Sequence, residues 1–307
     1  MSSLEKRIRQ WIDATGVAEP IRRSALIELL RGARRRRTAA RSRSRQQTRY
    51  PGADRTALPI VFGNGMAKSG SHLLEQFLEG LTEVSPLAFT ATHPVRTIAP
   101  EGRPRPDSLV MQELSWLAPG DMAWGYVPSR EPFLALMSQP PWASFFILRD
   151  PRDRVISHIL FATDLHPRHA MKQYYRDLPT MEARIHATIL GVPNLVPSVT
   201  EAYGTYRGWF TCPRVLVVRF EDLVHQRAET VDRMIRHLEN AGVPFEGSRP
   251  GLHASLEQAM SPSRSLTFRA GVSGAWREHF TAGNIETFKR STGDLLRVLG
   301  YEAGDDW

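Results

Sequence analysis

Three short apolar runs, each followed by turn residues and then by a helical pattern, constrain the fold more than any other feature of the sequence. The runs are LPIVF at 58–62, SFFIL at 144–148 and VLVVRF at 215–220. Repetition of strand, turn and helix is typical of βαβ units, whose strands form a parallel sheet. We therefore predict an α/β fold, a single domain with a central parallel sheet flanked by helices.

The helical patterns behind these runs support this interpretation. Apolar residues recur at helical spacing from Leu73 to Leu81, and the same pattern returns over 229–238. Behind the second run, Asp150 is suited to cap a helix and Pro151 to occupy its first turn. Ligands of parallel sheets bind at the carboxyl ends of the strands, so the turns after the three runs are the expected site.

Composition excludes several classes of protein. The 307 residues allow a sizeable core, and a charged content of 23% is ordinary for a soluble globular protein. No apolar run approaches the roughly 20 residues of a membrane helix, and the N-terminus has charges where a signal peptide is apolar. We therefore expect a cytoplasmic protein. The lone cysteine, Cys212, excludes an internal disulfide framework and a multi-cysteine zinc site.

Positive charge is concentrated near the N-terminus. Residues 31–49 hold nine arginines and no acidic residue, whereas residues 50–307 carry 26 basic and 28 acidic side chains. A segment rich in Arg and Ser, without apolar periodicity, buries too little surface to fold, so we expect 31–49 to be mobile. We assign 1–50 to a basic, partly helical or disordered extension and 51–307 to the main domain. The arginine run favours peripheral contact with an anionic membrane or an acidic partner, and a solvated tail without a specific ligand is the alternative.

A turn of small residues from Gly65 to Ser71 surrounds Lys68, directly after the first apolar run. Backbone N–H groups, a helix N-terminus and a lysine at one point bind a phosphate-like anion. The turn is not a nucleotide triphosphate loop, because GxxxxGK[ST] requires glycine before the lysine and Ala67 stands there. We therefore predict an anion site whose ligand is decided by other parts of the chain.

Two further stretches supply groups for a second anion. FILRDPRDRVISH places Arg149 at the end of a strand and Ser157 in the following helix, and FRAGVSGAWREHF adds Arg269. With the Lys68 turn, they resemble the sulfotransferase family that uses 3′-phosphoadenosine 5′-phosphosulfate (PAPS), over roughly 59–280. The resemblance implies a phosphosulfate-binding strand, loop and helix. It also implies a PAPS-dependent enzyme that transfers a sulfuryl group, without a metal, to a hydroxyl of a small-molecule, lipid or sugar acceptor.

The resemblance implies roles residue by residue. Lys68 is expected at the oxygen that bridges phosphate and sulfate, and the four residues after it near the 5′-phosphate. Tyr203 fits a tyrosine near the adenine, Ala270 replaces a lysine of the motif, and Leu73 replaces a tryptophan that often stacks on the adenine. The residues expected around PAPS are Lys68, Ser69, Gly70, Ser71, His72, Leu73, Arg149, Ser157, Tyr203, Arg269, Ala270 and Gly271.

The sequence departs from the family at the general base. The family commonly has a histidine two residues before a proline, and AWGYVPS has Tyr126 there. A tyrosine with an ordinary pKa near 10 is a poor base at neutral pH. Three interpretations stay open: Tyr126 orients the acceptor, His93 or a carboxylate takes the proton, or the acceptor is acidic, such as a phenol.

The segment 163–197 is helix-rich, and we expect it to form a wall over the acceptor. His166 and His169 are three residues apart, but they lack carboxylate or cysteine partners at suitable spacing, so we expect no metal. Two other functions are alternatives to sulfuryl transfer. One is a nucleotide- or RNA-binding protein, although we expect no nucleic-acid partner. The other is an ATP-dependent kinase, which would need a complete phosphate loop and a magnesium carboxylate.

Overall fold

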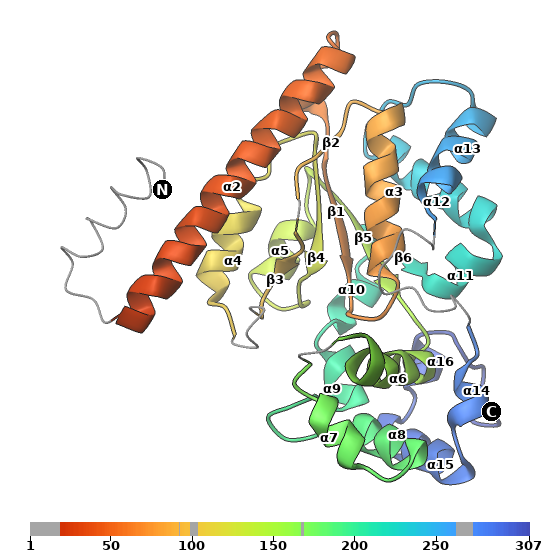
Figure 1. Cartoon of the computed structure of the whole chain (residues 1–307). Helices are drawn as coiled ribbons and strands as arrows, with labels where there is room; N and C mark the ends of the chain where they lie inside the picture. The colour runs from red at the N-terminus through yellow and green to blue at the C-terminus, as the bar shows by residue number, and fades with distance from the viewer. Residues whose placement is uncertain (1–18, 92, 99–103, 167–168, 262–272) are drawn as a thin grey trace.

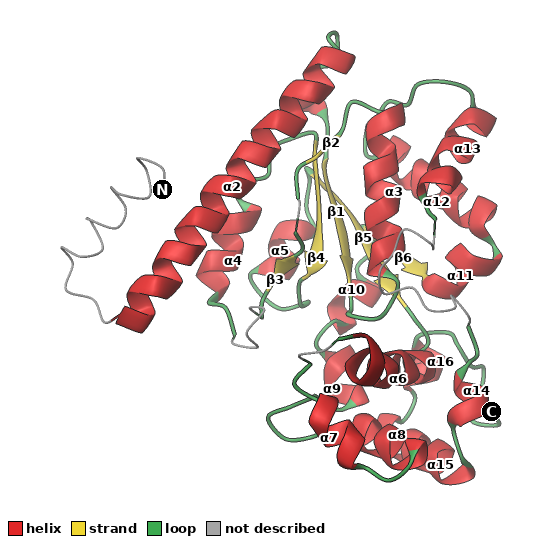
Figure 2. Cartoon of the chain, viewed as in Figure 1, coloured by secondary structure: helices red, strands yellow, loops and turns green. Residues whose placement is uncertain are grey.

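The computed structural model describes residues 19–91, 93–98, 104–166, 169–261 and 273–307. Within these residues, a six-stranded parallel sheet is flanked by helices on both faces (Figures 1 and 2). The strands are β1 (Ile60–Gly65), β2 (Ala88–Phe89), β3 (Val95–Arg96), β4 (Asp121–Tyr126), β5 (Trp142–Leu148) and β6 (Val215–Arg219). The larger helices are α2 (Glu19–Arg49), α3 (Ser71–Val84), α4 (Asp107–Leu114), α6 (Pro151–Leu160), α8 (Met181–Leu190), α12 (Arg227–Asn240), α13 (Arg249–Ala259) and α15 (Ala282–Thr292).

Shorter helices complete the described chain. Most of them lie in Figure 1 near the carboxyl ends of the strands or cover the face of the sheet opposite α3. They are α5 (Phe133–Met137), the π-helix η2 (Phe161–Leu165), α7 (Lys172–Asp177), α9 (Val199–Gly204), α10 (Arg207–Thr211), α11 (Phe220–His225), α14 (Trp276–His279) and α16 (Leu295–Val298), with a 3₁₀ turn at Arg55–Ala57.

The strand order is β2-β4-β1-β5-β6, with β3 also paired to β4. All pairs are parallel, and β1 is central, with β4 on one side and β5 on the other. Every residue of β1 and β5 is buried, as expected for strands covered on both faces. The prediction of an α/β fold with a central parallel sheet is therefore confirmed, and the three apolar runs correspond to β1, β5 and β6.

Neighbouring residues of each central strand pack into separate halves of the core. Val61 and Phe145 point toward the layer of α3, α12 and α13, whereas Phe62 and Phe146 point toward the layer that contains α4, α6 and α8. This alternation follows from the two-residue period of a strand. Asp150 caps α6 as predicted, since its carboxylate accepts a hydrogen bond from the Arg152 N–H.

The expectation that residues 31–49 are mobile is wrong for this structure. They form the C-terminal part of α2, which lies along the sheet beside β2 and α4 (Figure 1). Gln46 is buried and donates to the Thr82 carbonyl, and Ser42 donates to the Phe89 carbonyl. The composition misled because three of the arginines, Arg35, Arg43 and Arg49, find acidic partners on distant parts of the chain. The division of the chain at residue 50 stays a prediction.

Candidate phosphosulfate site

The loop between β1 and α3 has the backbone conformation of an anion cradle. Lys68 has a φ of 73°, a left-handed conformation that costs a lysine about 1–2 kcal/mol. Gly70 has a φ of 94°, and a Cβ there would lie 2.5 Å from the Phe220 ring, so only glycine fits. Such strain persists where the surrounding structure imposes it, and it is frequent at ligand sites.

Two groups of this loop are available to a bound anion. The Ser69 hydroxyl is buried, and it has no hydrogen-bond partner among the residues that the structure describes. Helix α3 begins without a side-chain cap, so its first N–H groups are not satisfied by a capping side chain. A buried polar group without a hydrogen-bond partner costs free energy. An oxyanion would accept hydrogen bonds from both the Ser69 hydroxyl and the first N–H groups of α3. The loop therefore fits the phosphate end of PAPS.

Lys68 supplies the charge at this point. Its Nζ lies 4.0 Å from the ring centroid of Phe161, at the start of the π-helix η2. Burial, and secondarily the charge of Arg149, lower the pKa of Lys68 to about 8. Lys68 is thus protonated at neutral pH but poorly hydrated, a state that a bound anion stabilises.

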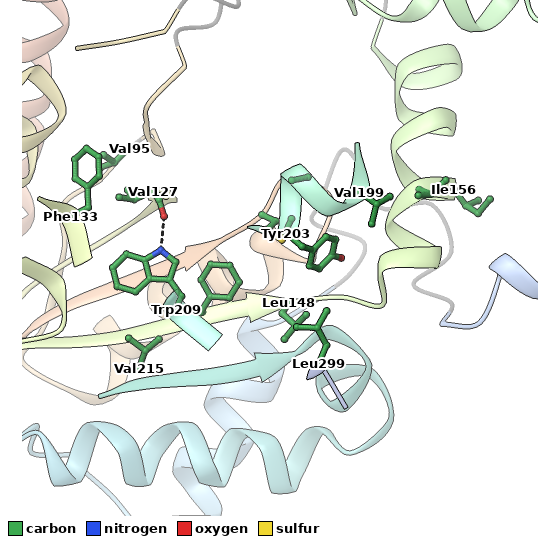
Figure 3. Close-up of a cluster of buried hydrophobic side chains, with 14 of the residues drawn as sticks. Val95, Val127, Phe133, Leu148, Ile156, Val199, Tyr203, Trp209, Val215 and Leu299 are labelled. Carbon is green, nitrogen blue, oxygen red and sulfur yellow. Dashed lines mark hydrogen bonds between the residues drawn. The ribbon is translucent and has the colours of Figure 1, made fainter. Parts of the chain in front are cut away.

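A second cationic point lies at the end of β5, the strand beside β1. Arg149 directly follows β5, and its guanidinium lies 4.6 Å from the centroid of the Phe220 ring. Tyr203 is 1% exposed, and its hydroxyl donates to the Arg149 carbonyl at 2.8 Å. Figure 3 shows Tyr203 in the buried cluster beside Leu148 and Val199. In this conformation Tyr203 supports the backbone of Arg149 and has little surface to offer an adenine.

The end of β1 is fixed to the segment after β4 by a buried amide. The Asn64 side chain donates to the Val127 carbonyl at 2.8 Å and accepts from the Val127 N–H at 2.9 Å. The indole of Trp209 donates to the same carbonyl, as the dashed line in Figure 3 shows. These bonds hold the strand end from which Tyr126 projects, one residue before Val127.

Tyr126 reaches the same loop. Its hydroxyl lies 2.8 Å from Ser71 Oγ at the start of α3, and Arg96 lies over its ring. Burial is the main cause that raises the pKa of Tyr126, so the phenol keeps its proton at neutral pH. Tyr126 is therefore placed to hold a hydroxyl, and the raised pKa disfavours it as a base.

The other predicted residues differ in their placement. His72 is partly exposed and lies 3.1 Å from Glu75, while Leu73 is 7% exposed within the core. His93 is exposed, and among the described residues no hydrogen bond, ion pair or ring contact joins it to the loop. Ser157 lies in α6, as predicted. Arg269, Ala270 and Gly271 lie outside the described residues.

Sequence reasoning missed Asp153, one turn before Ser157 in α6. Its buried carboxylate accepts hydrogen bonds from the N–H groups of Gly274, at 2.6 Å, and Trp276, at 2.9 Å. These bonds tie the described end of the FRAGVSGAW segment to the helix that carries Ser157. The available sequence signal was an acidic residue within the basic stretch RDPRDR. It could not be interpreted locally, because the partners of Asp153 are more than 100 residues away.

Aromatic and imidazole rings surround Lys68 on the η2 side. Phe161 lies 5.7 Å from His169, and His169 lies 5.3 Å from His158, between ring centroids. Burial lowers the pKa of His169 and lowers that of His158 to about 3, so both rings are neutral at pH 7. The Met171 N–H donates to His169 Nδ1, which places the proton of that neutral ring on Nε2.

Among the described residues, no group of three His, Cys, Asp or Glu side chains is arranged to hold a metal.

Comparisons with known proteins identify the family to which the chain belongs. The family model described as "Sulfotransferase domain" matches residues 145–300, just over half of the chain. The chain therefore belongs to the sulfotransferase family, which confirms the predicted enzyme class and disfavours the RNA-binding and kinase alternatives. A search of curated proteins finds no match.

Solved structures share the fold at low sequence identity. A mouse sulfotransferase, SULT7A1, complexed with PAP is 17% identical, with a TM-score of 0.58 over 86% of this chain and 94% of that one. Retinol dehydratase with androsterone and the inactive cofactor PAP is 14% identical, with a TM-score of 0.52 over 84% and 86%. Retinol dehydratase with retinol and PAP is also 14% identical, with a TM-score of 0.50 over 81% and 83%.

Proposed function

We propose that this sulfotransferase binds PAPS at the β1–α3 loop and transfers its sulfuryl group to a hydroxyl acceptor. One observation carries the proposal: the strained loop at the end of β1 combines Lys68, a Ser69 hydroxyl without a partner among the described residues, and a helix N-terminus without a side-chain cap. The PAP in the related structures is the nucleotide product that such a donor leaves. The related retinol dehydratase structures contain retinol or androsterone, and we extend only the hydroxyl class to this chain.

The roles of the residues follow from where charge develops. PAPS supplies the sulfuryl group, and negative charge grows on the phosphate oxygen that leaves it. Lys68 and the N–H groups at the start of α3 stabilise that charge without a metal. Arg149 and Ser157 hold the 3′-phosphate, and Arg269 and the Gly271 backbone join them as the resemblance implies. His72, Leu73, Tyr203 and Ala270 stay predicted neighbours of the nucleotide.

A thermal shift comparison tests the choice of nucleotide. We expect 3′,5′-adenosine bisphosphate to raise the unfolding temperature. At a hundredfold excess over its Kd, the nucleotide should add about 2.7 kcal/mol to the free energy of unfolding. ATP at the same concentration should give a much smaller shift, because it lacks the 3′-phosphate. A larger shift with ATP would contradict the proposal and favour the kinase alternative.

We propose that Tyr126 orients the acceptor hydroxyl and does not take its proton. The Tyr126→Phe variant removes one hydrogen bond, so we expect kcat/KM to fall about tenfold. Because the pKa of Tyr126 is raised, the phenol is protonated throughout pH 6–9, and the shape of the pH profile should not change.

The matched control is Tyr50→Phe, which removes a hydroxyl that donates to the Glu83 carbonyl beside the end of α2. It should leave kcat/KM unchanged. If Tyr126→Phe abolishes a limb of the pH profile, Tyr126 is the base and the orienting role is wrong. His93 stays an alternative base, to be examined with His93→Ala in the same assay.

We propose that one face of α2 contacts an anionic membrane surface. Four arginines spaced three or four residues apart share this face, and all are exposed. Among the described residues no acidic side chain pairs with them, whereas Arg35, Arg43 and Arg49 are paired within the protein. The four are Arg34, Arg37, Arg41 and Arg45. Within the described residues no helix is long and apolar enough to cross a membrane.

Vesicle cosedimentation tests this contact. Wild-type protein should bind vesicles that contain phosphatidylserine more tightly than pure phosphatidylcholine vesicles, and replacement of the four arginines by glutamine should remove most of the difference. The control replaces four exposed arginines elsewhere, Arg214, Arg236, Arg290 and Arg297, by glutamine. Equal losses in both variants would show that net charge, and not this face, is responsible.

A further inference from the structure

A cavity of about 310 Å³ lies between α2, α4 and the segment that joins β2 to β3. Four residues of α2 line it, and the other lining residues are Thr90, Ala91, His93, Val95, Glu113, Trp116, Leu117 and Ala123. None of the lining residues belongs to the β1–α3 loop, and neither Arg149 nor Ser157 is among them. The cavity is therefore separate from the proposed nucleotide site.

The walls of the cavity carry an excess of positive charge. Arg35, Arg36 and Arg43 line the cavity, and Glu113 is the one acidic residue among the lining residues. Arg35 pairs with Glu113 and Arg43 pairs with the buried Asp121, so Arg36 is in excess among these arginines. Such an excess beside a partly desolvated cavity favours an anionic occupant.

Arg36 is the cation of the lining with a contact to an aromatic ring. Its guanidinium lies 4.4 Å from the centroid of the Trp116 ring, and among the described residues no acidic side chain pairs with it. The planar guanidinium directs its N–H groups in one plane, which suits a carboxylate or a sulfonate. Arg36 can thus contact an anion directly, in addition to its share in the positive potential of the cavity.

The remaining wall is apolar. Ala39, Val95, Leu117 and Ala123 line the cavity together with Trp116, and a volume of about 310 Å³ is in the usual range for small-molecule sites. An occupant that is only charged would leave this wall exposed, whereas an occupant that is only apolar would leave the cations without a partner.

We propose that this cavity is a second ligand site, which binds a small apolar molecule with one anionic group. Helix α2 supplies the anion contact, and the sheet and α4 supply the apolar wall. Val95 lines the cavity, and its neighbour Arg96 lies over the Tyr126 ring, so an occupant touches the strand that flanks the acceptor position. His93, the alternative base, also lines this cavity, and among the described residues no hydrogen bond, ion pair or ring contact joins it to the β1–α3 loop. The proposal goes beyond sulfuryl transfer to this second site.

A matched pair of fluorescent probes tests the proposal. 1-Anilinonaphthalene-8-sulfonate has an apolar ring system and one sulfonate, and N-phenyl-1-naphthylamine has the same rings without the charge. We expect the folded full-length protein to bind the sulfonate with 1:1 stoichiometry and at least about tenfold more tightly than the uncharged probe. Equal affinity for both probes would overturn the anionic part of the proposal.

Variants of α2 locate the binding. Ala39→Trp fills the cavity and should abolish binding, while Ala40→Trp, on the exposed side, should not. Arg36→Gln should weaken sulfonate binding about tenfold, and Arg37→Gln, which has the same charge change outside the cavity, less than twofold. Urea unfolding confirms that each variant is folded. Binding to Ala39→Trp that equals wild type, or equal losses in the two Arg variants, would place the probe elsewhere and overturn the site.

Discussion

Replacement of Lys68 by alanine is expected to lower kcat about 10²- to 10³-fold, with a much smaller change in the Kd for 3′,5′-adenosine bisphosphate. The reason is that, in the proposed complex, Lys68 contacts the bridging oxygen, where negative charge grows only as the sulfuryl group leaves. The proposed contacts of the 3′-phosphate at Arg149 are unaffected. Transfer of label from radiolabelled PAPS to a hydroxyl acceptor measures kcat, and titration calorimetry measures the Kd.

Lys289→Ala is the control for this variant. Lys289 also lies over an aromatic ring, that of Trp307 at 4.9 Å, but it is in α15, outside the proposed site. It should keep the wild-type kcat. Turnover near wild type in Lys68→Ala, or equal losses in turnover and nucleotide affinity, would show that Lys68 does not act on the leaving group.

The same lysine predicts a pH dependence. The pKa of Lys68 in the free protein is lowered to about 8, mainly because it is buried. A lysine must be protonated to stabilise the leaving group, so kcat/KM should hold below pH 8 and fall as pH rises through 8. The residual activity of Lys68→Ala should lack this alkaline limb.

Replacement of Asp121 by asparagine is expected to destabilise the protein by about 3 kcal/mol or more. The Asp121 carboxylate is 0% exposed, and it binds Arg43 of α2, Arg55 and the Ala118 N–H. Asparagine has nearly the same shape but leaves two cations without their anion, which costs about 3–5 kcal/mol for a buried pair. We place the effect near the lower end, because Arg43 is about a third exposed. Urea denaturation measures the free energy of unfolding.

Asp107→Asn is the matched control. Asp107 pairs with Arg130 at the surface, where an ion pair contributes about 0–1 kcal/mol. We also expect Asp121→Asn to increase proteolysis of α2, since this carboxylate fixes the helix to the sheet. If both Asn variants lose the same stability, the Asp121 cluster does not hold α2 in place.

The central sheet could be predicted because its signals are local. The apolar runs of β1, β5 and β6, the cap at Asp150 and the apolar face of α3 each depend on neighbouring residues. The two-residue strands β2 and β3 are too short to leave a pattern. The docking of α2 could not be read from its composition, because Arg43 is 78 residues from Asp121 and Arg49 is 34 residues from Glu83.

The candidate site also has a part that could be predicted from the sequence and a part that could not. Lys68 and Arg149 follow strand ends, and the structure places both at the carboxyl ends of adjacent strands. The contacts that support them depend on tertiary packing. Phe161 meets Lys68 because the chain continues from α6 into a π-helix, and Asp153 meets Gly274 across 121 residues. Tyr203 stays a predicted neighbour of the adenine, and its buried hydroxyl supports the Arg149 carbonyl.

The most direct test of the central claim is a calorimetric comparison of 3′,5′-adenosine bisphosphate with adenosine 5′-monophosphate. The claim is that one protein face holds two phosphates at once, the first at Lys68 and the second at Arg149. Wild-type protein should therefore bind the bisphosphate about ten- to a hundredfold more tightly, and Arg149→Ala should lose most of that preference. Equal affinity of wild type for both nucleotides, or an undiminished preference in Arg149→Ala, would contradict the account.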